Sequence, residues 1–468
     1  MSSQNPLEIP EILWEVAQYV TGRTLLDCVR VSKAWYQAFL PQVWKDIELT
    51  TSKPHPPDAI HGYMYSRFVK TLRICCIPGR KYPCLILPRL ASLTVENGAY
   101  WNGRIFKIAA HYPTLTHLDL KGGLGDDSTL VLKMLTGLHN LKDVTLMGLK
   151  VNKKNVDTFW QLCAQLERLD VSFQCISTRD RRQPFIEFPR MHELRVKDFS
   201  VGDIPWIVEF MLRCPGLKSL GSLAQDANRL FIPRVAPLIR AGAWPHLQSI
   251  ALWTFSREED DIASIVAGMQ RIVAFEALLL LFTPTMMNLL RPHFSDLQTL
   301  GLFTAPGFTS AMAQEIMSSC PSLTTFKGCN IHAIDIACGR PWACLKLKVL
   351  ELRLLSDPLT LSQTQPWVFE QLSKLTMLQE LHVYSWETDG LTLDLRLGCG
   401  LGRLSTLQSL RFLDLSYTTM QTMQQPEIEW MLKHWKSLER ILGKLNTQSP
   451  AHDEVLKMRL RCHGIAVL

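Results

Sequence analysis

Apolar residues recur along most of this chain in a six-residue pattern, apolar-x-x-apolar-x-apolar, which predicts a short β-strand with one buried face. The clearest copies begin at Leu115, Leu166, Leu297 and Leu410, and others begin at Val69, Leu90, Leu141, Met191, Leu247, Phe275, Leu347 and Leu378. Weaker copies begin at Leu217, Leu323 and Leu438, with Ser222, Gly328 and Gly443 at the sixth position. The pattern predicts an array of about fifteen similar units.

The spacing of the copies indicates what each unit contains. From Leu115 to Leu438 there are twelve intervals over 323 residues, a mean near 27, which is the spacing of leucine-rich repeats. Each unit is a strand plus a helical return that cannot bury its own apolar face, so the units stack into one core. Four copies follow a proline, in 111–115, 214–217, 244–247 and 320–323, that ends the preceding helix. The sequence predicts an α/β solenoid, a leucine-rich-repeat array whose parallel strands line a concave face.

A small helical module is predicted before the repeats. An apolar stripe at helical spacing predicts a first helix over residues 9 to 20, formed by Ile9, Ile12, Leu13, Val16 and Val20. Pro10 suits its first turn, and Ser32 is placed to cap a third helix that Pro41 is expected to end. Fewer than fifty residues make a marginal core, so such a module usually needs a partner or the following domain.

Composition marks the domain boundaries. Thr50 to Arg67 contains three prolines and no apolar period, which indicates a linker. The glycine-rich segment 398–402, inside the insertion 386–407, is interpreted as a flexible loop rather than a phosphate-binding loop. The segment Ser449 to Leu468 mixes apolar and charged residues as a terminal cap does. We therefore predict a helical module at 1–49, a linker at 50–68, the repeat array at 69–445 and a C-terminal cap at 446–468.

Length and charge exclude several classes of protein. The chain has 468 residues, of which 47% are hydrophobic and 20% charged, so an extended core is expected and a disordered scaffold is not. The net charge of +7 is small for this length and argues against nucleic-acid binding. The longest nearly apolar run, Ile272 to Phe282, is too short to span a membrane, and no signal peptide is recognised. Thirteen irregularly spaced cysteines favour free thiols and a cytoplasmic or nuclear location.

The strand alternation predicts a binding surface. The third, fifth and seventh positions of each copy should face solvent. In the early and late copies these positions are mostly charged: Arg168, Asp170, Glu193, Arg195 and Lys197, then Glu351, Arg353, Glu380, His382 and Tyr384. In the middle copies they are apolar, and we predict target binding there, at Leu223, Trp253, Leu279, Leu281 and Phe303. The alternative is that a folded loop or the C-terminal tail covers this patch.

Catalytic chemistry is not nominated by any motif. Cys329, His332, Cys338 and Cys344 could be counted as zinc ligands, but their spacing fits no strong template and favours core or loop residues. The chain has no serine-nucleophile elbow, phosphate-binding lysine motif or paired-histidine helix motif. We expect no cofactor, no metal and no enzymatic activity.

The N-terminal residues resemble a known family. Ile9-Pro10-Glu11-Ile12-Leu13, Leu25-Leu26, the segment 29–33, Trp35 and Val43-Trp44 together resemble an F-box, which docks on the Skp adaptor of cullin-type ubiquitin ligases. The resemblance covers residues 5 to 49 and implies that the adaptor contact is lined or supported by Leu7, Ile9, Pro10, Ile12, Leu13, Val31 and Trp35. It also implies that Trp44 anchors the module to the domain after it. The alternative is that these residues form only the core of a helical cap.

The repeats resemble the irregular leucine-rich repeats that follow F-boxes in fungal proteins, over residues 69 to 445. Together the two resemblances imply a substrate-recognition subunit of an SCF-type ubiquitin ligase, with the Skp-type adaptor and through it a cullin as partners, and an unidentified target protein on the array. One alternative is a repeat scaffold acting outside a ligase. Another is a repeat-based regulator of an enzyme, in which the first fifty residues are only a cap.

Overall fold

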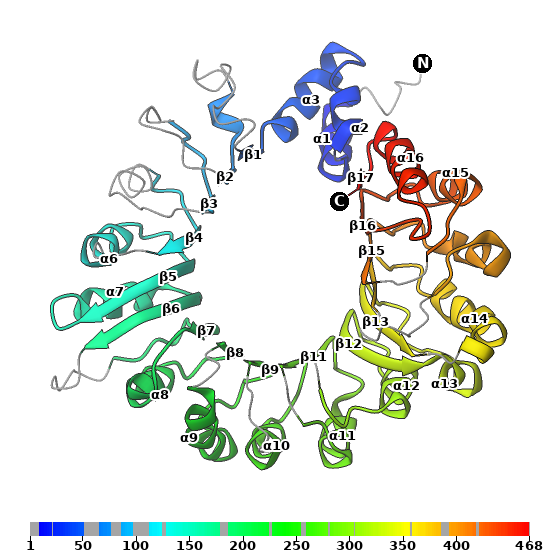
Figure 1. Cartoon of the computed structure of the whole chain (residues 1–468). Helices are drawn as coiled ribbons and strands as arrows, with labels where there is room; N and C mark the ends of the chain where they lie inside the picture. Colours follow the sequence, from blue (N-terminus) through cyan, green and yellow to red (C-terminus); the bar gives the residue numbers. More distant parts are fainter. Residues whose placement is uncertain are drawn as a thin grey trace, which may run out of the picture. The chain divides into compact units, whose positions relative to one another are not determined.

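A computed structural model of the chain describes residues 9–20, 22–50, 65–75, 86–96, 112–123, 128–177, 186–223, 227–253, 259–278, 281–303, 305–355, 358–384, 393–417 and 421–467. It divides into two compact units, Met1–Leu217 (unit 1) and Lys218–Leu468 (unit 2). In each unit parallel strands form one layer and helices cover one of its faces (Figure 1). The predicted α/β leucine-rich-repeat solenoid is confirmed.

Unit 1 begins with three helices and continues as strands joined by short returns. Its elements are α1 Pro10–Tyr19, α2 Gly22–Cys28, α3 Lys33–Val43, β1 Asp46–Leu49, η2 Ser66–Phe68, β2 Thr71–Ile74, β3 Ser92–Val95, β4 His117–Gly123, α6 Ser128–Thr136, β5 Asp143–Asn152, α7 Val156–Gln165, β6 Arg168–Ser177, β7 Glu193–Lys197, η4 Val201–Asp203 and α8 Ile204–Leu212. Each strand from β1 to β7 pairs in parallel with the next. The first strand of the sheet therefore follows α3 directly.

Unit 2 repeats the same alternation, with helices of 6 to 16 residues. Its elements are β8 Ser219–Leu223, α9 Asn228–Arg240, β9 Ser249–Trp253, α10 Glu259–Gly268, β10 Ala274–Leu278, α11 Pro284–Leu290, η5 Arg291–His293, β11 Thr299–Phe303, α12 Ser310–Ser319, β12 Thr325–His332, α13 Ala333–Cys338, β13 Val349–Leu355, α14 Pro358–Ser373, β14 Glu380–Tyr384, η6 Leu397–Cys399, η7 Leu401–Thr406, β15 Phe412–Tyr417, α15 Gln425–His434, β16 Arg440–Gly443, α16 Pro450–Cys462 and β17 Ala466–Val467. Strands β8 to β17 again pair in parallel, in chain order. No helix in the described ranges is both long and apolar enough to cross a bilayer.

The prolines that precede the copies share one turn. The N–H of Leu217 donates to the carbonyl of Cys214 at 3.2 Å, and Leu247, Leu323 and Leu115 donate in the same way to the residue before their proline. That residue is buried in all four copies: Tyr112, Cys214, Trp244 and Cys320. The turn therefore buries one apolar side chain in the core of the array and leads directly into the next strand.

Glycine occupies the sixth position where the backbone passes close to the preceding strand. Gly328 has φ of +74°, and a Cβ there would lie 2.0 Å from the carbonyl oxygen of Leu302. Gly443 has φ of +97°, and a Cβ there would lie 2.5 Å from the carbonyl oxygen of Leu415. The two weak copies that carry these glycines, at Leu323 and Leu438, do form strands in the structure. Glycine is needed at both positions because it has no Cβ to overlap the neighbouring strand and it tolerates positive φ.

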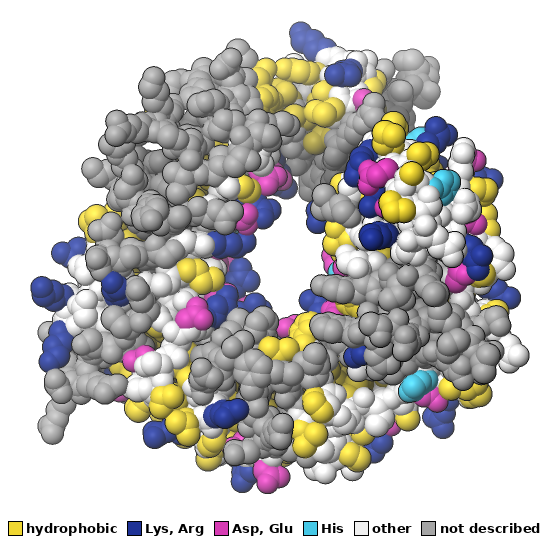
Figure 2. Space-filling view, viewed as in Figure 1, with side chains coloured by type: hydrophobic (Ala, Val, Ile, Leu, Met, Phe, Trp, Pro, Cys, Tyr) yellow, Lys and Arg dark blue, Asp and Glu magenta, His cyan; other side chains and the backbone are white. Residues whose placement is uncertain are grey.

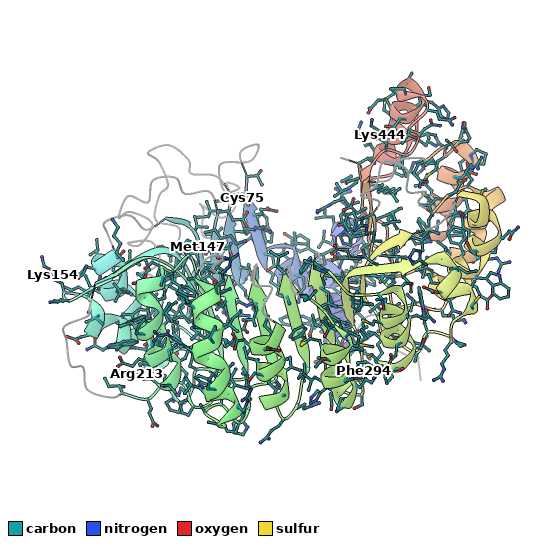
Figure 3. The ribbon with its side chains drawn as sticks, turned by 60° about the horizontal axis from the view of Figure 1, so that its bottom comes forward. Cys75, Met147, Lys154, Arg213, Phe294 and Lys444 are labelled. Carbon is teal, nitrogen blue, oxygen red and sulfur yellow. The ribbon has the colours of Figure 1, made fainter. Side chains whose placement is uncertain are left out.

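The aromatic core of unit 1 contains a buried arginine. Three aromatic rings pack together with their centroids 5.1–5.6 Å apart: Phe159, Trp160 and Phe210. Arg213, which follows α8 and is labelled in Figure 3, lies over the Trp160 ring at 4.9 Å and pairs with Glu209 at 2.5 Å. Burial of this guanidinium is sustained by the ring contact and the ion pair together.

Three local predictions need correction. Pro41 does not end α3, which continues to Val43 because only one backbone donor is lost and Trp44 N–H still donates to Leu40. The glycine-rich segment 398–402 is not a loop, since it lies in η6 and η7, where Leu401 and Leu404 are buried. The copy placed at Phe275 begins at Ile272, because Phe275 pairs with Leu300 and Ile250, the fourth residues of their copies.

Candidate functional site

The helical module of α1–α3 has a very small core. Leu13, Ala17, Ala38 and Phe39 are its buried residues. Ser32 caps α3 by accepting a hydrogen bond from Trp35 N–H at 3.3 Å, as predicted. Because four side chains fill the core, large apolar side chains remain outside it: Ile12, Trp14, Tyr19, Leu26, Val31 and Tyr36. The module presents an exposed apolar surface.

The structure separates the predicted adaptor residues into exposed and supporting ones. Ile12 is 38% exposed and Val31 is 62% exposed, and Pro10 is exposed at the start of α1. Leu13 is fully buried, and Trp35 is half-buried with its ring stacked on Phe39 at 5.1 Å. Leu7 lies outside the described residues, and Ile9 is the half-buried N-cap of α1. Leu13 and Trp35 can therefore support a contact, whereas Ile12 and Val31 can line one.

The module is joined to the first strands by aromatic contacts. The ring of Trp44 stacks on Tyr65 at 4.9 Å, and the hydroxyls of Tyr65 and Tyr36 are hydrogen-bonded at 3.0 Å. The carbonyl of Lys45 accepts from the N–H groups of Lys70 and Thr71. Trp44 thus contacts a residue near the end of the predicted linker.

We call the surface formed by the third, fifth and seventh positions of the copies the strand face. In unit 1 it consists largely of ion pairs, and basic and acidic side chains lie close together beside β4–β7 in Figure 2. Glu96 accepts hydrogen bonds from Lys121 at 2.8 Å and Arg73 at 2.7 Å, which lower the pKa of the Glu96 carboxyl to about 2. Lys197 pairs with Asp170 at 2.8 Å, with both side chains less than one-fifth exposed. Basic side chains on this part of the strand face thus have acidic partners, although Asp119 Oδ1 and Asp170 Oδ1 are buried without a hydrogen-bond partner among the described residues.

Between β10 and β13 the strand face of unit 2 carries both apolar and polar side chains and, among the described residues, few ion pairs. With the copy beginning at Ile272, its outward residues are Ala274, Glu276 and Leu278. Leu278 lies beside Phe303 of β11, the seventh residue of the next copy. Both side chains are half-buried, so the apolar part of the predicted target surface continues at these two positions.

A hollow of about 250 Å³ opens on this part of the strand face. It is lined by Leu278, Phe303, Gly328, Asn330, Glu351, Arg353 and Tyr384. The Arg353 Nε is shielded from solvent and has no hydrogen-bond partner among the described residues. An unsatisfied buried donor of this kind costs about 1–3 kcal/mol, more when charged. Burial raises the pKa of the Glu351 carboxyl, so the hollow disfavours the ionised form of this acid.

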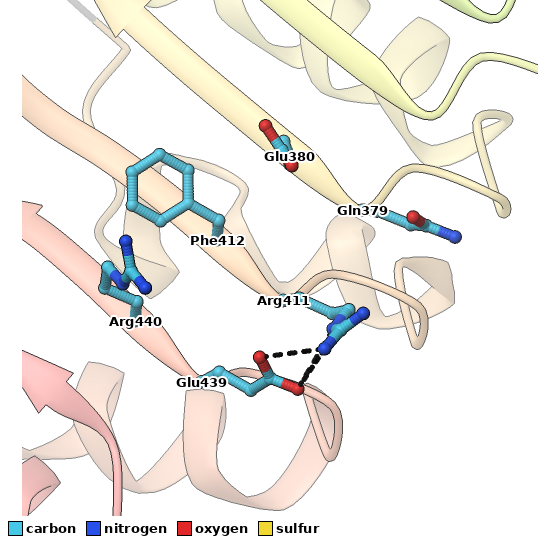
Figure 4. Close-up of a pocket in the computed structure, with 6 residues that line it drawn as sticks. All are labelled: Gln379, Glu380, Arg411, Phe412, Glu439 and Arg440. Atoms are coloured by element: carbon cyan, nitrogen blue, oxygen red, sulfur yellow. Dashed lines mark hydrogen bonds and ion pairs between the residues drawn. The ribbon is translucent and has the colours of Figure 1, made fainter. Parts of the chain in front are cut away.

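Beyond the hollow the strand face is again internally paired. His382 Nδ1 lies 3.3 Å from Asp414 Oδ2 and 3.2 Å from the hydroxyl of Tyr384. A second hollow, of about 310 Å³, lies at the start of β14–β16 and is shown in Figure 4. There Arg411 makes a bidentate ion pair with Glu439, and the guanidinium of Arg440 lies over the ring of Phe412 at 5.6 Å. The two arginines of this second hollow already have partners.

The predicted target residues fall into three groups. Phe303 lines the hollow, as an outward strand residue should. Leu223 and Trp253 end β8 and β9, but their side chains lie outside the described structure, as does the whole of Leu279. Leu281 is half-buried and follows β10, so the register places it outside the strand face and corrects its assignment.

Sequence reasoning missed Leu278 and Asn330. Residues 272–277 and 275–280 both fit the six-residue pattern, so the pattern alone allowed either frame. Even spacing would have selected Ile272, which is 25 residues after Leu247 and 25 before Leu297. Asn330 takes the place of Cys329 opposite Arg353 because β12 shifts register after Phe326, at the glycine with positive φ.

Among the described residues, no three His, Cys, Asp or Glu side chains cluster as metal ligands would. His332 and Cys338 are exposed and Cys344 is buried, so the predicted placement in core or returns fits these three positions. The side chain of Cys329 lies outside the described structure. Burial raises the pKa of the Cys320 and Cys344 thiols to about 12, which keeps both protonated at neutral pH.

Comparisons with known proteins give distant similarities. No protein-family model matches the chain. An alignment over 176 residues, which covers 34% of this chain and 15% of the other protein, shows 24% identity to lysine-specific demethylase 2A of Xenopus tropicalis. A chain in the structure of the yeast Rad7 and Elc1 complex is 14% identical, with a TM-score of 0.46, over 98% of this chain and 91% of its own length. An internalin of Listeria monocytogenes is 13% identical, with a TM-score of 0.29, over 76% of this chain and 81% of its own length.

Proposed function

We propose that this chain is a substrate-recognition subunit of an SCF-type ubiquitin ligase and is not itself an enzyme. Its helical module docks on a Skp-type adaptor, which links it to a cullin, and its strand face holds a target protein. The observation that carries the proposal is the exposed apolar surface of the helical module, formed on the residues whose order resembles an F-box.

Exposed apolar residues occur on more than one helix of the module, which supports a docking surface there. Ile12 and Tyr19 are seven residues apart, two turns of α1, and so lie on one side of that helix. Val31 lies just before α3, and Tyr36 is in its first turns. Exposed apolar side chains contribute little to the stability of a module that has four buried core residues. Their burial in an interface with another protein would be favourable.

The repeat array supplies the second half of the function. In unit 1 the strand face carries paired charges, and in unit 2 it carries an apolar hollow with an unsatisfied polar group. A receptor of this kind acts by position, because holding a target near a transfer enzyme raises its effective concentration without chemistry by the receptor. The similarity to the demethylase spans 15% of that protein and does not extend the activity in its name to this chain.

Adaptor binding tests the proposal directly. The full chain, co-expressed with a recombinant Skp-type adaptor, should co-purify with it, and the double variant Ile12→Lys/Val31→Lys should not. Both side chains are exposed, so the variant should keep its melting temperature. Leu130→Lys, which changes an exposed leucine of α6, is the matched control and should bind as the wild type does. Equal adaptor recovery from the double variant and the control would overturn the proposal and favour a scaffold outside a ligase.

A further inference from the structure

The hollow of unit 2 differs from the rest of the strand face in its charge balance. In unit 1 the basic residues of this face have acidic partners, for example Arg73 with Glu96 and Lys197 with Asp170. The side chains of Lys327 and Arg353, on β12 and β13, form no ion pair and no hydrogen bond within the described part of the chain. Arg353 in the hollow, and Lys327 on the strand beside it, therefore lack the acidic partner that the basic residues of unit 1 have.

The acid that lines the hollow, Glu351, forms no ion pair with Arg353 or Lys327 among the described residues. Glu351 lies two residues before Arg353 on β13 and lines the same hollow, but burial raises the pKa of its carboxyl. Coulombic attraction to His382 and Lys327 opposes this shift without overcoming it. The hollow therefore offers an anion the guanidinium of Arg353, whose Nε is buried without a hydrogen-bond partner among the described residues.

Apolar and polar groups follow one another along a single row. The seventh positions of β10, β11, β13 and β14 are Leu278, Phe303, Arg353 and Tyr384, and the register shift in β12 places Asn330 opposite Arg353 in the same row. At about 4.8 Å per strand the row is about 19 Å long, the length of about six residues of extended peptide. Phe303 and Arg353 are two strands apart, about 10 Å, which an extended chain covers in about three residues. The row is too long for a small molecule of the size that a 250 Å³ hollow encloses.

We propose that this row binds an extended peptide segment of the target that carries an apolar side chain and, two to four residues away, an anionic one. The apolar side chain packs on Leu278 and Phe303, and the anion accepts hydrogen bonds from the guanidinium of Arg353 and the amide of Asn330. The inference rests on the proposed function only in taking the strand face as the target site. The anion is a carboxylate or a phosphorylated side chain, because both accept from a guanidinium in the same way.

Peptide selection on the full chain tests the proposal. A displayed library of random decapeptides, selected on the wild-type chain, should yield sequences with an apolar residue two to four positions from Asp or Glu. Selection on Arg353→Glu should lose this acidic residue, and Phe303→Ala should lose the apolar one. Arg168→Glu changes an exposed arginine of the strand face of unit 1 and should leave the selected sequences unchanged.

Synthetic peptides from the selection then separate the two anions. The Glu form, its Gln counterpart and its phosphoserine counterpart are titrated against the wild type, Arg353→Gln and Arg353→Glu. The anionic peptides should bind Arg353→Gln about tenfold more weakly than the wild type, and the Gln peptide should bind both alike. Recovery of no peptide, of peptides without the spacing, or of peptides indifferent to Arg353 would overturn the proposal. Adaptor recovery from the same preparations reports on the helical module separately, so failure here is distinct from failure of the ligase function.

Discussion

The ring of Trp44 stacks on the ring of Tyr65, with centroids 4.9 Å apart and planes within 16°. Tyr65 in turn shares a hydrogen bond with Tyr36 of α3 and packs on Phe68 at 6.5 Å. Tyr65, near the end of the predicted linker, therefore contacts both the helical module and η2, the short helix before β2. This contact makes the module part of the folded array, although its own core is small.

Replacing Trp44 should weaken this junction. Trp44→Ala removes the stacking partner of Tyr65, and loss of a half-buried aromatic contact costs about 1–3 kcal/mol. Differential scanning calorimetry should show a lower melting temperature, and hydrogen exchange should show faster opening of α1–α3. Trp14→Ala changes an exposed tryptophan of the same module and should change neither. Equal effects of the two substitutions would mean that the junction is held by other contacts.

The sequence allowed prediction of the array and of one wall of the hollow, but not of the hollow itself. Phe303 was predicted because the copy at Leu297 has a single frame, whereas two overlapping frames hid Leu278. The position of Asn330 was not predicted, because a bulge at a glycine with positive φ adds a residue to β12. Counting positions from the start of a copy does not reveal such a bulge. The lack of a partner for Arg353 Nε depends on side chains from neighbouring strands. Such a property belongs to the assembled face rather than to any one copy.

Glycine at the sixth position should be required for stability. Gly443→Ala places a Cβ 2.5 Å from the backbone of Leu415 at a φ of +97°. A strained backbone of this kind costs about 1–3 kcal/mol, and the overlap adds to it. Urea unfolding should therefore shift to a lower midpoint. Gly398→Ala meets no atom within 4 Å and is the matched control, expected to be neutral or slightly stabilising. Similar midpoints for both variants would contradict the close approach at Gly443.

The ion pairs of Glu96 should make stability depend on pH. Hydrogen bonds from Lys121 and Arg73 lower the pKa of Glu96 from 4.5 to about 2 in the folded chain. A carboxyl with a depressed folded pKa contributes stability above its unfolded pKa and loses it as the pH falls. The contribution should thus be complete above pH 4.5 and disappear between pH 4.5 and about 2.

This pH dependence is measured by urea unfolding at a series of pH values. The free energy of unfolding of Glu96→Gln should fall less steeply with acid than that of the wild type in this window. Lys121→Met removes the first hydrogen-bond donor and should reduce the slope in the same direction. Parallel curves for the wild type and both variants would show that Glu96 gains nothing from its two partners.

Truncation within unit 2 should prevent folding of the shortened chain. A chain ending at Pro321 retains β11 and α12 but loses β12 and the strands after it. Leu300, Leu302 and Ile316, now fully buried, would then form part of an open apolar end. Each repeat of a solenoid is covered only by the repeats beside it, so exposure of a whole cross-section of the core should give insoluble protein. A chain ending at His463 keeps the cap helix α16, where Leu456 and Leu460 are buried, and loses only β17. This control should remain soluble and melt cooperatively; if the chain ending at Pro321 does the same, the repeats fold as separate units and not as one stacked core.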